Sequence, residues 1–103
     1  MYLKVSPDHG IQLEERDNFR AFKLVVEARR EQIEDVRRLL ADTAELPDQD
    51  TAWVFEAALR CWPGVEFDDK WQQSLTAMIG KARPHGWIDD TRKAIKAHVE
   101  WAG

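Results

Sequence analysis

Apolar and polar residues alternate in three short stretches near the start of the chain, which predicts three β-strands. The stretches cover residues 2–5, 11–15 and 19–27, and alternation with a period of two is typical of strands that bury one face. Residues 7–10 and 16–18 between them contain Pro, Asp, Gly and Asn, which favour turns. We therefore expect an N-terminal three-strand meander.

The hydrophobic period changes over residues 29–41 and predicts an amphipathic helix. Ile33, Val36 and Leu40 recur at helical spacing and form one apolar stripe that would pack on the sheet. The other positions are mostly charged, as expected of a solvated helix face. Residues 41–50, rich in acidic residues, alanine and proline, are predicted to form a linker.

A second helix is predicted to begin at Asp50 or Thr51 and to end at Trp62. The residue before a proline is disfavoured in the α conformation, and Pro63 follows Trp62. An alternative stays open, in which residues 51–55 are extended and lead into a shorter helix. In the helical interpretation, one buried stripe would consist of Val54, Ala57, Ala58 and Cys61.

The clearest helix start lies at Asp69. Gln72 follows three residues later, which is the spacing of a capping box. Trp71, Leu75, Met78, Ile79 and Ala82 then share one helical face. Pro84 ends this third helix.

The last segment is ambiguous between strand and helix. Residues 95–101 alternate without error, which favours a half-buried strand, although Ile95 and Val99 also share one helical face. We predict a strand that pairs with one of the first three. The expected fold class is α+β, a small mixed sheet packed with about three helices in the order β-β-β-α-α-α-β.

Composition and charge indicate one soluble domain over residues 1–103. The net charge is −4, with 8 Lys and Arg against 12 Asp and Glu in residues 1–52 and 7 against 7 in the rest. Neither half resembles a basic nucleic-acid footprint, and the longest aliphatic run, Leu24–Val26, is too short for a membrane span. A single cysteine forms no intrachain disulfide. We therefore expect a cytoplasmic protein that binds neither nucleic acid nor membrane.

The tryptophans are the most unusual feature, since all five lie in the second half. Trp71 and Trp101 fall on periodic apolar faces and are predicted to be core. Trp62 and Trp87 lie at element ends, where an indole is often only partly covered. The predicted binding surface therefore consists of Trp62, Phe67, His85 and Trp87.

Residue types able to do catalysis are few, and each has a simpler structural explanation. His98 and Glu100 would share one strand face and could pair as a base and its orienting carboxylate, but Lys96 completes an ordinary polar face. Asp89 is explained by a turn or helix cap, and Cys61 by burial. No metal-ligand spacing and no glycine-rich phosphate loop occurs, so we expect no metal and no cofactor.

These observations favour a non-catalytic accessory or protein-interaction domain of a cytosolic, bacterial-type pathway. Its partner would be another protein or a second copy of the chain. The alternative is a small enzyme or small-molecule-binding protein with a tryptophan-lined pocket for an apolar ligand, in which His98, Glu100 or Asp89 would supply polarity.

Overall fold

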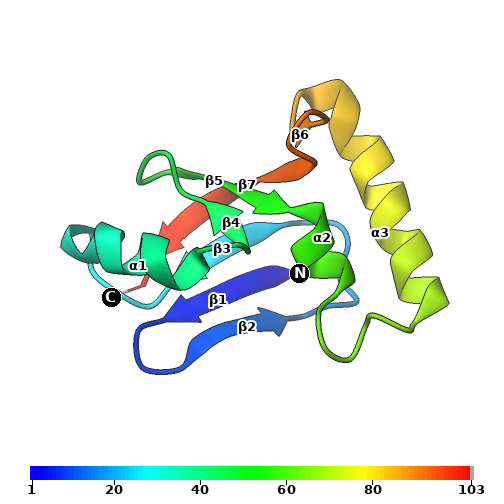
Figure 1. Ribbon diagram of the computed structural model, residues 1–103. Coiled ribbons are helices and arrows are strands. Elements are labelled where there is room, and N and C mark those ends of the chain that lie inside the picture. Colours follow the sequence, from blue (N-terminus) through cyan, green and yellow to red (C-terminus); the bar gives the residue numbers. More distant parts are fainter. Residues whose placement is uncertain (103) are drawn as a thin grey trace.

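One curved, mixed β-sheet is at the centre of the fold, and helices cover its concave side (Figure 1). The computed structural model describes residues 1–102. The strands are β1 (Tyr2–Ser6), β2 (Gly10–Glu14), β3 (Lys23–Val26), β4 (Ala44–Glu45), β5 (Thr51–Phe55), β6 (Ile88–Asp89) and β7 (Ala94–Trp101). The α-helices are α1 (Ile33–Leu40), α2 (Glu56–Arg60) and α3 (Asp69–Ala82), with 3-10 turns at η1 (Arg30–Gln32) and η2 (Arg83–His85). The α+β class is confirmed, but this seven-stranded sheet is larger than predicted.

The N-terminal strands do not form the predicted meander. The sheet order is β2-β1-β3-β7-β5-β4, with β6 also paired to β7. β2 is antiparallel to β1, whereas β3 lies on the other side of β1 and runs parallel to it. The connection over residues 15–22 passes the start of β1, where the Met1 amino group donates hydrogen bonds to the carbonyls of Asn18 and Ala21. Alternation alone is the same for parallel and antiparallel strands, so it could not predict this order.

The C-terminal segment is a strand, as predicted, and β7 lies at the centre of the sheet. Its second half, from His98, pairs in parallel with β3, which confirms pairing with one of the first three strands. Its first half pairs antiparallel with β5 on one side and with β6 on the other. The strand therefore joins the N-terminal part of the sheet to the tryptophan-containing half.

Residues 51–55 are a strand rather than the start of a helix, so the alternative interpretation of this segment holds. Ala52 and Val54 are fully buried, whereas Thr51, Trp53 and Phe55 are half-exposed, and this alternation is a strand period. Helix α2 is consequently only Glu56–Arg60. Cys61 follows this helix and is exposed, so the prediction of a buried Cys61 is wrong.

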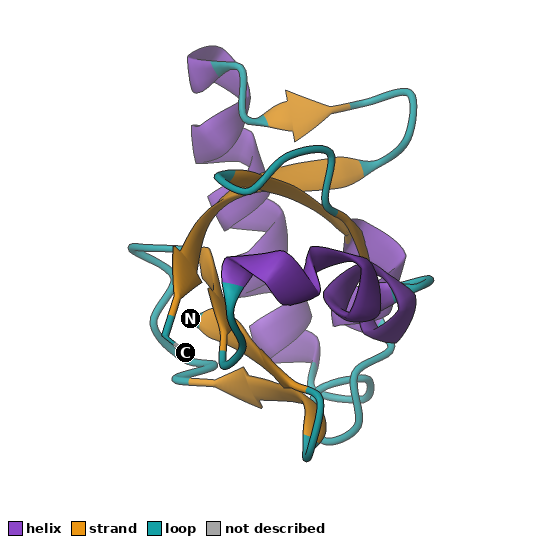
Figure 2. Ribbon diagram, turned by 90° about the vertical axis from the view of Figure 1, so that its left-hand side faces the viewer, coloured by secondary structure: helices purple, strands orange, loops and turns teal. Residues whose placement is uncertain are grey.

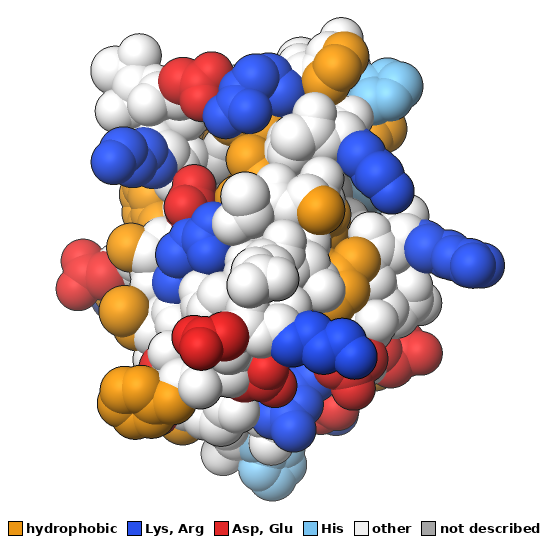
Figure 3. All heavy atoms as spheres, turned by 90° about the vertical axis from the view of Figure 1, so that its right-hand side faces the viewer, with side chains coloured by type: hydrophobic (Ala, Val, Ile, Leu, Met, Phe, Trp, Pro, Cys, Tyr) orange, Lys and Arg blue, Asp and Glu red, His pale blue; other side chains and the backbone are white. Residues whose placement is uncertain are grey.

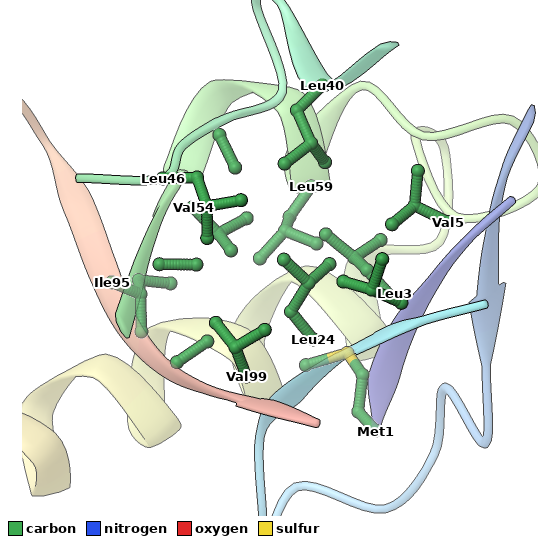
Figure 4. Close-up of a cluster of buried hydrophobic side chains, with 14 of the residues drawn as sticks. Met1, Leu3, Val5, Leu24, Leu40, Leu46, Val54, Leu59, Ile95 and Val99 are labelled. Atoms are coloured by element: carbon green, nitrogen blue, oxygen red, sulfur yellow. The ribbon is translucent and has the colours of Figure 1, made fainter. Parts of the chain in front are cut away.

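A single hydrophobic core lies inside the curve of the sheet (Figure 2). Figure 4 shows side chains of β1, β3, β5 and β7 pointing to the same interior, where Leu40 of α1 and Leu59 of α2 meet them. Helices α1 and α3 lie on opposite sides of this interior (Figures 1 and 2). Helix α3 adds Trp71, Leu75 and Ile79 to the core.

The start of α3 is capped by Asp68, one residue before the predicted position. An Asp68 carboxylate oxygen accepts a hydrogen bond from the backbone N–H of Trp71 at 3.1 Å, which satisfies a donor left free in the first helical turn. The Gln72 side chain does not complete a capping box. Its amide instead donates to the carbonyls of Arg60 and Val65, both at 3.0 Å, and so fixes the loop between α2 and α3.

Candidate interaction surface

Phe67 is the most exposed large hydrophobic residue, with 93% of its surface accessible. The turn that carries it is nevertheless well fixed. Val65, two residues earlier, is 2% exposed, and its carbonyl accepts hydrogen bonds from the Asp68 N–H at 3.1 Å and from the Gln72 side chain. Asp68, the residue after Phe67, caps α3. Phe67 therefore projects into solvent from a turn that is anchored on both sides.

Acidic side chains surround Phe67. Glu66, Asp68 and Asp69 are all exposed, and none forms an ion pair with another side chain of residues 1–102. Together with Gly64 and Phe67 they line an open hollow of about 510 Å³. This end of α3 thus presents an aromatic ring within a negatively charged rim.

Trp62 stabilises the turn that carries Phe67 and adds little to the exposed surface around it. It is half-buried and packs against the hydrophobic core. Its carbonyl accepts a hydrogen bond from the Val65 N–H at 3.1 Å. Of the two tryptophans predicted to be only partly covered, Trp62 is thus the more firmly held by the fold.

A second aromatic group lies at the other end of α3. The rings of His85 and Trp87 stack with centroids 4.4 Å apart and an interplanar angle of 20°, and 46% of Trp87 is exposed. Gly86 between them has a φ of 77°, a left-handed conformation that favours glycine. The Trp87 carbonyl accepts a hydrogen bond from the Lys96 N–H of β7 at 2.8 Å, which fixes this tryptophan to the edge of the sheet.

The four residues of the predicted binding surface therefore form two separate groups. Phe67 precedes α3 and the His85–Trp87 stack follows it, and a helix of 14 residues is about 20 Å long. Figure 3 shows the side of the molecule on which α3 lies: acidic side chains gather in its lower half, and basic side chains lie mostly in its upper half. The sequence analysis placed these four residues on one surface, although the helix that it predicts from Asp69 to Pro84 separates Phe67 from Trp87.

The two tryptophans predicted to be core differ in their burial. Trp71 is 3% exposed, which confirms its place in the core. Trp101 is only half-buried: it packs against the core, and its indole N–H donates to the Gln49 carbonyl at 2.7 Å. The Arg30 guanidinium lies 6.0 Å from the centre of the Trp101 ring.

The structure does not bring the candidate catalytic residues together. His98 and Glu100 lie on the exposed face of β7, and Glu100 pairs with Lys23 of β3 at 3.2 Å. Asp89 is opposite Ala94, four residues before His98 in the strand, which places it roughly 13 Å away along β7. Neither of two open hollows on the surface, at Phe67 and between α1 and Pro7, is lined by any of these three residues.

Asp89 has a structural role in the turn that leads into β7. Its carboxylate accepts hydrogen bonds from the backbone N–H groups of Thr91 and Arg92, at 3.1 and 3.0 Å, and from the Arg92 guanidinium at 2.7 Å. These bonds, that from the Arg92 side chain first, hold the pKa of Asp89 below its usual value. The ionised Asp89 carboxylate therefore stabilises this turn.

Sequence reasoning missed Trp53, which lies on the convex face of the sheet. Trp53 of β5 is directly opposite Lys96 of β7. The Arg92 guanidinium lies 5.7 Å from the centre of the Trp53 ring. The alternation of residues 51–55 was the available signal, because a strand there places Trp53 on the face opposite to Ala52 and Val54.

Within residues 1–102, no group of three His, Cys, Asp or Glu side chains is arranged to hold a metal ion. In the same part of the chain, no helix is both long and apolar enough to cross a membrane. Comparison of the chain with protein-family models, with curated proteins and with solved structures gives no match.

Proposed function

We propose that this chain is a non-catalytic protein-interaction domain with a contact surface along α3. The observation that carries the proposal is the 93% exposure of Phe67 on a turn anchored by buried Val65 and by the Asp68 cap. Large aromatic residues contribute most of the binding free energy at many protein interfaces. A side chain presented by a fixed turn also loses little conformational entropy when a partner covers it.

The group at the other end of α3 supports the same function. Trp87 is half-exposed although it is hydrogen-bonded to β7, and His85 stacks on it. Such a rigid aromatic pair needs little reorganisation to become an interface anchor. An exposed aromatic group at each end of α3 favours an extended contact with a protein surface.

The alternative of a small-molecule pocket has less support. A ligand site is usually a concave, mostly apolar cavity with a few convergent polar groups. The hollow between α1 and Pro7, of about 360 Å³, is open and contains no aromatic side chain. The hollow at Phe67 is open as well and has an acidic rim. Neither is lined by a tryptophan, which the pocket hypothesis requires.

Site-specific photocrosslinking in cells tests the proposed function. The photoreactive residue p-benzoylphenylalanine replaces Phe67, and in a control it replaces Asp42, which is exposed in the loop after α1. We expect a discrete cross-linked product from position 67 that position 42 does not give. The same products from both positions, or none from position 67, would contradict the proposal.

A further inference from the structure

The outward face of α3 is exposed along the whole helix. Trp71, Leu75 and Ile79 are buried in the core. On the opposite face, exposed residues recur at the same helical spacing, and these are Asp69, Gln73, Ala77, Gly80 and, just beyond the helix, Pro84. Figure 1 shows α3 along the outer edge of the molecule, and Figure 3 faces it. The middle of this face is uncharged, with an exposed aromatic residue beyond each end.

The two ends of this face carry opposite charge. Glu66, Asp68 and Asp69 lie at the N-terminal end beside Phe67. Lys81, Arg83 and His85 lie at the C-terminal end beside Trp87. Arg83 is paired with Asp90 at 2.8 Å, whereas Lys81 has no ion pair with another side chain of residues 1–102. Lys70, which is exposed and has no ion pair among residues 1–102, reduces the negative charge of the N-terminal end, but that end stays net negative. The face is therefore complementary in net charge to a reversed copy of itself.

We propose that the occupant of this surface is a second copy of the chain, packed with its α3 antiparallel to the first. A two-fold axis near Ala77 would produce this arrangement, because Ala77 is midway in sequence between Phe67 and Trp87. Phe67 of each copy then meets the His85–Trp87 stack of the other. At this register Asp69 of each copy lies opposite His85 of the other and about one helical turn, roughly 6 Å, from Lys81 of the other. The small residues Ala77 and Gly80 let the helix backbones approach.

A two-fold arrangement has the further consequence that the interface closes on itself. In an isologous dimer each patch meets the same patch of the other copy, so no unpaired binding surface remains. The single interface of this dimer contains both aromatic groups and both charged ends of each copy. The inference rests on the proposed function and identifies the interaction partner as a second copy of the chain.

Charge reversal and mixing test the inference by analytical ultracentrifugation of the purified chain. One variant combines Glu66→Lys with Asp69→Lys, and the other is Lys81→Glu. None of these side chains caps a helix or is buried. We expect the wild type to dimerise with a Kd of roughly 1–100 µM, the weak end of the affinities that protein interfaces give, and each variant alone to dimerise at least about tenfold more weakly.

The mixture of the two variants is the decisive sample. In a two-fold heterodimer, the introduced lysines of one chain meet the introduced Glu side chain of the other, and the native acidic end meets the native Lys81. We therefore expect mixing to restore dimers of close to wild-type affinity. A wild type that stays monomeric at about 500 µM, well above the expected Kd, or a mixture that does not associate, would overturn the inference. If a different protein is then the partner that cross-links at position 67, the proposed function itself survives.

Discussion

The indole N–H of Trp71 donates a hydrogen bond of 2.9 Å to the carbonyl of Arg16, 55 residues earlier in the chain. It joins the first turn of α3 to the loop that follows β2. Phe19 from the same loop packs on Trp71, with ring centroids 5.7 Å apart at 55°. Trp71 thus connects the tryptophan-containing half to the N-terminal strands, and α3, with its contact surface, depends on it for its position.

Trp71→Ala is expected to be among the most destabilising single substitutions. Removal of a buried aromatic side chain leaves a cavity and typically costs about 3–5 kcal/mol, a large part of the roughly 5–15 kcal/mol of a typical domain. Trp71→Phe keeps most of the packing but leaves the Arg16 carbonyl without its donor, so a smaller loss of about 1 kcal/mol is expected. Urea denaturation measures both. Equal stability of Trp71→Ala and wild type would show that α3 is not anchored in this way.

Local patterns predicted most of the elements. Four elements have a clear hydrophobic period, and their predicted bounds were correct within a few residues. These are the strands at residues 2–5 and 95–101 and the helices that begin near residues 29 and 69. The conformation of residues 51–55 was harder to predict, because Val54 fits a helical stripe with Ala57 and Cys61 as well as a strand face. Pairing with β7 decides between the two, and a contact so distant in sequence leaves no local signal.

The arrangement of the surface could be predicted only in part. Position at element ends led to Trp62 and Trp87 with their neighbours Phe67 and His85. Of these, Phe67 and Trp87 are exposed large hydrophobic residues, whereas Trp62 is half-buried. The 14 residues of α3 separate Phe67 from Trp87 by about 20 Å. Which face of α3 is outward depends on the packing of Trp71, Leu75 and Ile79 against strands from both halves of the chain. The parallel placement of β3 depends on the path of residues 15–22, and alternation carries no information about it.

The two acidic residues at the start of α3 are expected to differ in their effect on stability. Asp68→Ala removes the side chain that accepts from the Trp71 N–H and should cost about 0.5–2 kcal/mol. Asp69→Ala removes only a favourable charge in the first turn, typically worth about 0.3–1 kcal/mol. Thermal unfolding at low salt measures both variants. A larger loss for Asp69→Ala would place the cap at Asp69.

Two glycines are expected to respond in opposite directions to alanine. Gly64 has a φ of 97°, and a Cβ there would lie 3.0 Å from the Arg16 guanidinium, so Gly64→Ala should destabilise by about 1 kcal/mol or more. Gly80 is within α3, and a Cβ there has nothing within 4 Å. Gly80→Ala should stabilise the monomer by about 0.5–1 kcal/mol. Chemical denaturation at low protein concentration tests the pair, and a shift of the same sign for both would contradict the local geometry.

The Asp89 turn is expected to weaken in acid. Folding lowers the pKa of Asp89 below its usual value of 3.8, chiefly through the hydrogen bond from Arg92. The carboxylate therefore contributes stability above the usual pKa, and this contribution is lost as the pH falls through the lower, folded pKa. An NMR titration of the Asp89 carboxyl should give a midpoint below 3.8 in the wild type, and Arg92→Gln should raise it. A midpoint that Arg92→Gln does not move would rule out this cause.

The affinity of Phe67→Ser for the protein that cross-links at position 67, whether a second copy or another chain, tests the central claim most directly. We expect binding to weaken at least about tenfold, as for an interface anchor, while the free energy of unfolding stays within about 0.5 kcal/mol of wild type because Phe67 contributes little to the core. Val65→Ala is the matched comparison, since Val65 is buried in the same turn and its truncation should lower stability by about 1–3 kcal/mol. Unchanged affinity of a stably folded Phe67→Ser chain would contradict the account.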